Sequence, residues 1–296
     1  CGAASVSLRH TFTVARPHDD EWPPELATVP SPPKSLHYTG DIAVLAQPCV
    51  AIVGSRHPTA YGERVARDLS RALASAGACI VSGMAFGVDA IAHRAALECG
   101  GTTAAVLGAG SDTVYPRSHI ALYDEIAQRG VVLSEFGAGV GTFQGCFPRR
   151  NRVIAGLCRL TIVVEAGAKS GSLITAGYAG DFGRNVAAVP GPIDSPQSAG
   201  TNQLLRDGAQ VIASIDDALA LAALTAHANA RMPVSLGADE ATVWACLEEG
   251  ALLTPDALAA QTGLPVERLT ATLLLLELKR LVAKRADGTF EMRPRD

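Results

Sequence analysis

The feature that most constrains this chain is an alternation of short apolar runs with amphipathic segments, which repeats from residue 49 to residue 225. Runs that are apolar throughout suit strands buried on both faces, and such strands usually lie parallel beneath helices. The alternation therefore predicts an α/β fold in which helices cover both faces of a parallel sheet. Strands are expected at 49–54, 78–82, 103–107, 131–134, 160–165, 186–189 and 209–212, and helices at 60–76, 87–99, 117–129, 151–157, 171–183, 201–207 and 215–225.

The segments on either side of this unit differ in composition. Residues 1–48 are rich in proline, which blocks helices and central strands. They are predicted to form an extended lead-in or linker, with short edge strands at Leu36–Tyr38 and Ile42–Leu45. Residues 226–238 show no firm period and are predicted to be a second linker.

Residues 239–296 are predicted to form a small separate domain. Helical stretches at 238–249, 254–262 and 266–281 precede the dipeptide Asp287-Gly288, which favours a hairpin turn. Three helices followed by a β-hairpin are typical of a winged-helix module. Residues 235–296 carry seven basic and ten acidic side chains, a balance that does not favour DNA binding by this domain.

Charge and cysteine content narrow the classes of function. The formal net charge is −4, and no long region is basic overall, so nucleic-acid binding requires a local patch. The seven cysteines are odd in number and have no metal-ligand spacing, so no metal site is predicted and a reducing, cytoplasmic setting is expected. No apolar run is long enough to span a bilayer, so no membrane association is expected.

The stretch Cys49–Gly62 combines the first predicted strand of the alternation, a polar turn and a helix start. Backbone N–H groups at a helix start attract anions, and Arg56 in the turn adds a guanidinium suited to phosphate. Gly54, Ser55 and Arg56 are therefore candidates for a phosphate pocket. The alternative is an ordinary strand-to-helix turn in which Arg56 is a solvated surface residue.

Two later segments offer similar chemistry. Phe147 precedes Arg150-Asn151-Arg152 in the densest basic cluster of the chain, where guanidinium groups suit phosphates and an aromatic ring suits base stacking. The alternative is a helix start with a solvated basic face and Phe147 in the core. Lys169-Ser170-Gly171 follows another strand and either cradles an anion or simply caps a helix.

Motifs of nucleotide enzymes are mostly missing from the sequence. No loop has the GxxxxGK[ST] form, the first predicted strand is not followed by GxGxxG, and no serine lies in a GxSxG turn. Glu135 and Glu165 end two strands near the predicted crevice and are the candidate acids or bases of an enzyme. Such carboxylates more often hold loops or neutralise arginines, so no catalytic residue and no cofactor is predicted.

Taken together, several strings resemble the DNA processing protein A (DprA, also called Smf) family, over about residues 22–217 and in the family's order. The strings are Ile52-Val53-Gly54-Ser55-Arg56 with Tyr61-Gly62, Ser82-Gly83-Met84-Ala85 with Gly87-Val88-Asp89 and Ala92-His93, Tyr115-Pro116, Ser134-Glu135, Phe147-Pro148 through Arg150-Asn151-Arg152 to Gly156, Val164-Glu165-Ala166, Ser170-Gly171-Ser172-Leu173 with Thr175-Ala176, Val189-Pro190-Gly191, and Gly200-Thr201-Asn202 with Gly208-Ala209.

This resemblance implies an extended Rossmann-like domain that binds single-stranded DNA, forms homodimers and helps to load the RecA recombinase onto incoming DNA during natural transformation. It also implies that Gly54-Ser55-Arg56 lines a phosphate pocket and that Lys169 lies on the same DNA-binding face, together with Phe147 and Arg150-Asn151-Arg152. The winged-helix tail occurs in some members. The sequence departs from the pattern because the helical domain that often precedes the Rossmann-like unit is absent or lost from this chain and the tail is acidic.

The leading hypothesis is thus a non-catalytic protein that binds and protects single-stranded DNA and assists homologous recombination. Its phosphate contacts are expected from Arg56, Arg150, Arg152 and Lys169, with backbone N–H groups near Gly54 and Gly171. Two alternatives stay open: a nucleotide-processing hydrolase on a similar Rossmann-like scaffold, and an interaction scaffold in which the C-terminal domain recruits a partner.

Overall fold

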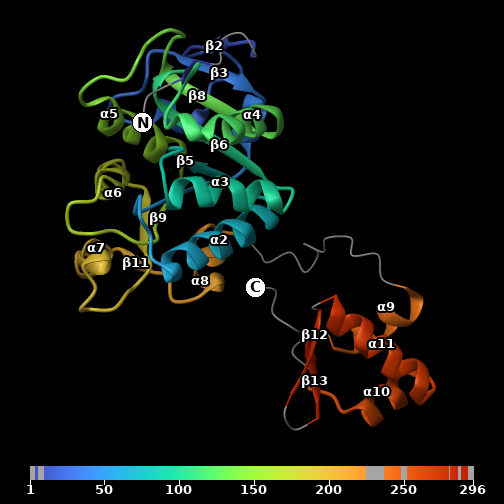
Figure 1. Cartoon of the computed structure of the whole chain (residues 1–296). Helices are drawn as coiled ribbons and strands as arrows, with labels where there is room; N and C mark the ends of the chain where they lie inside the picture. The colour runs from blue at the N-terminus through green and yellow to red at the C-terminus, as the bar shows by residue number, and fades with distance from the viewer. Residues whose placement is uncertain are drawn as a thin grey trace. The chain divides into compact units, whose positions relative to one another are not determined.

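The computed structural model describes residues 4–5, 10–224, 237–247, 252–279, 281–285 and 288–292. The chain forms two compact units, Cys1–Ala230 and Arg231–Asp296, which are treated separately (Figure 1). The predicted linker at 226–238 lies almost wholly outside the described residues. In the described ranges no helix is both long and apolar enough to cross a bilayer.

The first unit is built on a sheet that has nine strands within the described part of the chain. Their order is β11-β10-β9-β4-β5-β6-β8-β3-β2, and the seven strands from β11 to β8 run parallel, as the alternating pattern predicted. These are β4 (Cys49–Val53), β5 (Cys79–Ser82), β6 (Thr102–Gly110), β8 (Val131–Phe136), β9 (Leu160–Val163), β10 (Asn185–Ala188) and β11 (Gln210–Val211).

The N-terminal segment differs from the predicted extended lead-in because it joins the sheet. β3 (Leu36–Gly40) pairs antiparallel with β8, and β2 (Thr13–Ala15) pairs antiparallel with β3. Leu36 and Tyr38 of β3 enter the core, and α1 (Pro24–Ala27) adds Leu26. β3 is therefore not an edge strand, and Ile42–Ala46 forms a 3₁₀ helix, η1, rather than a strand. The prolines at 30–33 fall in the β2–β3 connection, where no ladder hydrogen bond is required of them.

Alternate residues of the central strands pack on opposite faces of the sheet. Val50 and Ile52 of β4 contact the cluster formed by α2 (Ala60–Ser75), α3 (Val88–Glu98) and α8 (Ile215–Leu221). Ala51 and Val53 point the other way, into the cluster that contains α5 (Cys146–Leu157) and α6 (Ser172–Asp181). The two-residue period of a strand thus gives two apolar cores, one on each side of the sheet.

The remaining elements complete the unit, and most helices lie close to their predicted ranges. α5 is the main difference, because it begins at Cys146 rather than at residue 151. Pro148 stands in its first turn, where the missing N–H is tolerated, so Phe147 is helical. The other elements are β1 (Ala4–Ser5), which pairs with β7 (Thr113–Val114), η2 (Arg117–His119), α4 (Ile120–Arg129), η3 (Pro196–Ser198) and α7 (Ala199–Arg206).

The second unit has the predicted order of three helices and a hairpin. It consists of α9 (Ala238–Cys246), α10 (Pro255–Thr262), α11 (Val266–Leu278), β12 (Val282–Lys284) and β13 (Phe290–Met292). Thr254 caps α10 by accepting a hydrogen bond from the Ala257 N–H at 3.2 Å, and Gly263 ends it with φ +68°. Val243, Leu258 and Phe290 belong to its own core. Asp287, the first residue of the predicted turn, lies outside the described residues.

Candidate nucleic-acid-binding site

The candidate site lies at a point where the chain changes direction across the sheet. β4 and β9 are neighbours, yet the strands that follow β4 build one half of the sheet and those that follow β9 build the other. The connections that leave the carboxyl ends of β4 and β9 therefore diverge and leave a crevice between them. A pocket of about 620 Å³ occupies this crevice, and we name it the switch-point pocket.

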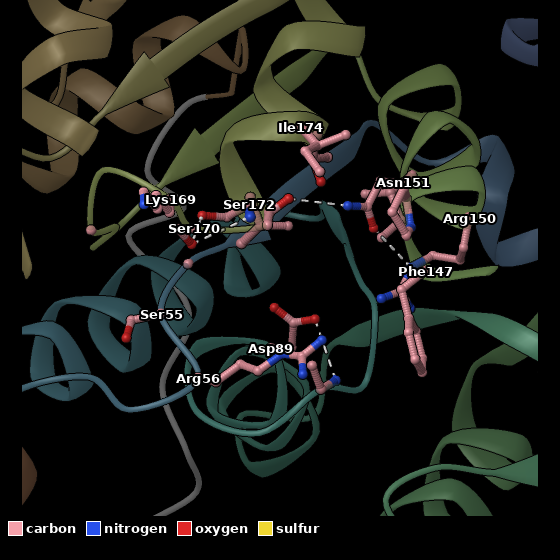
Figure 2. Close-up of a pocket in the computed structure, with 18 residues that line it drawn as sticks. Ser55, Arg56, Asp89, Phe147, Arg150, Asn151, Lys169, Ser170, Ser172 and Ile174 are labelled. Atoms are coloured by element: carbon pink, nitrogen blue, oxygen red, sulfur yellow. Dashed lines mark hydrogen bonds between the residues drawn. The ribbon is translucent and has the colours of Figure 1, made fainter. Parts of the chain in front are cut away.

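Nine of the ten predicted site residues line the switch-point pocket (Figure 2). They come from the β4–α2 loop, from the first turns of α5 and from the β9–α6 loop, which lie far apart in the sequence. These residues are Gly54, Ser55, Arg56, Phe147, Arg150, Asn151, Lys169, Ser170 and Gly171. Arg152 is not among the lining residues. The apolar residues Ile154 and Ile174 also line the pocket, although no sequence pattern marked them as site residues.

Close packing shapes the loop that follows β4. A Cβ atom on Gly54 would lie 2.8 Å from a methyl group of Val88 and 2.9 Å from the carbonyl oxygen of Glu165. Gly87 has φ +73°, and a Cβ there would lie 2.3 Å from the carbonyl oxygen of Ser55. The same carbonyl accepts a hydrogen bond from the Val88 N–H at 3.1 Å. Two glycines therefore let the β4–α2 loop rest directly on the start of α3.

Arg56 and Lys169 supply exposed positive charge at the pocket. Neither side chain has a carboxylate partner within the described ranges of the chain. The Arg56 guanidinium lies 5.8 Å from the ring centroid of Phe147, a cation–π distance, and the Phe147 ring also meets Tyr115 at 5.4 Å. Phe147 is thus half-buried beside Arg56, so one residue supplies the charge and the other an aromatic surface.

Arg150 lines the pocket but is directed inward. Its side chain is only 6% exposed, and its guanidinium donates to the carbonyl oxygens of Gly83 and Val106. Asp89, also buried, accepts from the N–H groups of Gly83 at 3.1 Å and Ala85 at 3.3 Å. Burial raises the pKa of Asp89, and the charge of Arg150 opposes that rise. These partners fix the Arg150 side chain, and its predicted phosphate contact stays a prediction.

Asn151 connects the base of the pocket to its far wall. It accepts from the Nε–H of Arg150 at 3.0 Å and donates to the carbonyl oxygen of Gly171 at 3.2 Å. Ser170 and Ser172 are hydrogen-bonded through their hydroxyl groups at 2.8 Å, at the point where α6 begins. The chain of contacts from α5 to the β9–α6 loop fixes the loop that carries Lys169. Figure 2 shows these side chains around the pocket.

Arg152 is held by partners outside the lining of the pocket, and its predicted phosphate contact stays a prediction. Its guanidinium donates to Glu135 and to the carbonyl oxygen of Ser31. Arg149 forms a second ion pair with Glu135, at 3.0 Å. The predicted basic cluster is therefore divided: Arg150 is buried under the pocket, while Arg149 and Arg152 share one carboxylate elsewhere. The physical reason is the helix itself, because residues two apart lie on nearly opposite sides.

The two carboxylates considered for catalysis have structural partners. Glu135 is held between Arg149 and Arg152. Glu165 is 4% exposed and accepts from the N–H of Thr59 at 3.1 Å and from its hydroxyl at 2.7 Å, just before α2 begins. No group of three or more histidine, cysteine, aspartate or glutamate residues in the described segments is arranged to hold a metal ion.

Comparison with known proteins places this geometry in a family. The sequence model of DNA recombination-mediator protein A matches residues 13–223, and that of the DprA winged helix domain matches residues 227–288. Protein Smf of Synechocystis is 44% identical over 208 residues, which are 69% of this chain and 52% of that protein. The chain thus spans about half the length of this curated relative.

Solved structures agree with the match. The X-ray structure of DNA processing protein A from Streptococcus pneumoniae superposes with a TM-score of 0.68 at 42% identity, covering 71% of this chain and 74% of that one. A structure of DNA processing protein A from Helicobacter pylori, described by its single-stranded DNA binding mode, gives a TM-score of 0.64 at 34% identity, covering 71% of this chain and 94% of that one. Because the family model matches residues 13–223, which are most of the chain, this chain belongs to the DNA recombination-mediator protein A family, also known as DprA or Smf.

Proposed function

We propose that the switch-point pocket binds the backbone of single-stranded DNA without catalysing a reaction on it. The observation that carries this proposal is the pair of exposed cations, Arg56 and Lys169, on two loops that converge on one pocket. Such charges suit consecutive phosphates, and the adjacent Phe147 ring suits a base. The Helicobacter pylori relative, whose structure is described by its single-stranded DNA binding mode, supports the same ligand here.

The buried groups beneath the pocket support a binding role rather than a catalytic one. Arg150, Asp89 and Asn151 hold the loops in place, and Glu165 is hydrogen-bonded to Thr59. We therefore assign phosphate contact to Arg56 and Lys169, and loop positioning to Arg150 and Asn151. A preformed pocket of this kind keeps the cations apart and oriented before the strand arrives.

The wider role follows from the family. We propose that the protein protects incoming single-stranded DNA and passes it to the RecA recombinase in natural transformation, acting as a homodimer in the cytoplasm. The description of the family as a recombination mediator supports this role. The homodimer surface and the recombinase contact stay predictions.

Fluorescence anisotropy with labelled oligo-dT at several salt concentrations tests the proposal. Arg56→Ala and Lys169→Ala should each weaken binding and reduce the slope of log affinity against log salt by about 0.7, the value for one phosphate contact on a single strand. Arg67→Ala is the matched control, because Arg67 is an exposed arginine of α2 outside the pocket lining.

The proposed phosphate contacts would be contradicted if the slope of log affinity against log salt were the same for Arg56→Ala and Lys169→Ala as for the control Arg67→Ala. Incubation of the wild-type protein with mononucleotides tests the alternative function. Release of free base or phosphate would favour a nucleotide-processing hydrolase instead.

A further inference from the structure

A second pocket lies beside the first at the same rim of the sheet. It has a volume of about 520 Å³ and is lined by Thr59, Tyr61, Glu165, Pro190, Gly191, Pro192, Ser195 and Ser198. We name it the Tyr61 pocket. Its walls come from the first turn of α2, the end of β9 and the connection between β10 and α7. The volume lies within the range of pockets that hold small organic groups.

The two pockets are neighbours through shared backbone. Gly54, which lines the switch-point pocket, packs so closely on Glu165 of the Tyr61 pocket that a Cβ would lie 2.9 Å from the Glu165 carbonyl oxygen. Gly167 of the switch-point pocket lies close to Pro196, because a Cβ atom added to Gly167 would lie 3.4 Å from the carbonyl oxygen of Pro196. The backbone at Gly54 and Glu165 therefore separates a strand held by Arg56 and Lys169 from the Tyr61 pocket by a single close contact at this point.

The lining of the Tyr61 pocket favours a base over a phosphate. The charged residue that lines the Tyr61 pocket is Glu165, whose carboxylate repels a phosphate. No lysine or arginine is among the lining residues. The other walls are an aromatic ring, two prolines and small hydroxyl side chains. Flat apolar surfaces of this kind bind the π-face of any base.

The aromatic ring is held in place before any ligand arrives. The Tyr61 hydroxyl donates to the carbonyl oxygen of Pro190 at 3.2 Å, which ties α2 to the β10–α7 connection. The side chain nevertheless remains 39% exposed. The guanidinium of Arg64 lies 5.7 Å from the ring centroid and places positive charge next to the aromatic surface. An anchored but exposed ring loses little conformational freedom on stacking.

We propose that the Tyr61 pocket is a nucleobase subsite, which receives a base of the same DNA strand whose phosphates bind in the switch-point pocket. This inference rests on the proposed function, and it adds a contact with the base to the backbone contacts described above. Because stacking does not distinguish strongly between bases, the subsite should be tolerant of sequence.

The test compares two ligands of equal length, oligo-dT and a backbone in which every base is replaced by an abasic tetrahydrofuran unit, at low salt. Tyr61→Ala should weaken binding of oligo-dT about 5- to 140-fold, the range of one lost stacking contact. The Tyr61→Ala variant should match the wild type in its affinity for the abasic strand and in the slope of log affinity against log salt. Tyr61→Phe keeps the ring and should retain affinity for oligo-dT, and thermal unfolding of both variants checks the fold.

The outcomes separate the subsite from the function on which it rests. If Tyr61→Ala leaves oligo-dT binding unchanged, or weakens both ligands equally, the nucleobase subsite is overturned. The phosphate role of the switch-point pocket is judged independently, by the lower salt slope of Arg56→Ala on both ligands. If the wild type binds neither ligand, the proposed function and the subsite are both overturned.

Discussion

Replacement of Arg150 by methionine separates a structural role from a direct role in binding. The guanidinium donates to two carbonyl oxygens and to Asn151, and it offsets the buried charge of Asp89. Methionine fills similar space without donors or charge, so Asp89 is left as a buried carboxylate without its cation. Leaving a buried charge uncompensated in this way costs about 3–5 kcal/mol in the free energy of unfolding, a large share of the roughly 5–15 kcal/mol typical of a whole domain.

Urea denaturation in a Trp244→Phe background measures this loss. The chain has two tryptophans, so Trp22 then reports on the first unit alone, where its side chain is buried in the core. Arg150→Met combined with Asp89→Asn should regain part of the loss, because asparagine removes the unpaired charge and keeps an oxygen for the Gly83 and Ala85 N–H groups.

The deficit of Arg150→Met relative to the wild type should also shrink at low pH. Without the arginine, burial raises the pKa of Asp89 further above its unfolded value, so the charged form is the costly one. The cost is absent below the unfolded pKa, grows as pH rises and levels off above the folded pKa. If the variant is as stable as the wild type and instead lowers the salt slope of DNA binding by about 0.7, Arg150 contacts phosphate and the structural assignment is wrong.

Two further predictions concern the helix α3 and the loop before it. Burial lowers the pKa of His93 to about 3 from its ordinary 6.5, so the unfolded chain binds the extra proton and stability falls with pH below 6.5. The loss should be about 2 kcal/mol between pH 7 and pH 5. His93→Gln should flatten the urea-derived pH profile, and an unchanged profile would exclude His93 as its source. Gly87→Ala should cost about 1–3 kcal/mol more than Gly77→Ala. Both positions have positive φ, but only Gly87 would press a Cβ against Ser55. Equal costs in thermal or urea unfolding would refute the steric argument.

The parallel core could be predicted from sequence because its strands are apolar on both faces. Cys49–Val53 and Leu160–Val163 read as buried runs whatever their neighbours are. The strand at 36–40 was predicted only in part, as a short edge strand at Leu36–Tyr38, because its pairing with β8 joins segments far apart in the chain. The strand at 13–15, which pairs with β3, was not predicted because it is only three residues long. The density of prolines correctly predicted an irregular connection between the two strands. It did not predict that the strands on either side of this connection join the sheet.

The rim loops of the site were also predictable, since ligands of such sheets bind at the carboxyl ends of strands. The separate positions of Arg150 and Arg152 were not, because they depend on where α5 begins and how it rotates against the sheet. A helix that starts at Cys146 places side chains two residues apart on nearly opposite sides, so only one of the two arginines can face the pocket. The sequence showed that basic residues cluster at 149–152. It did not show that the geometry of α5 places Arg150 at the pocket and Arg152 beside Glu135.

The adjacency of β4 and β9 has a consequence for the growing chain. Until residues 160–163 leave the ribosome, β4 is an apolar strand with one unpaired side, a type of edge that other chains can pair with. The loop that carries Lys169 comes still later in synthesis. The pairing of β9 with β4 therefore covers the exposed edge and brings the loop after β9 beside the loop after β4, so a first unit that ends before residue 160 lacks one wall of the switch-point pocket.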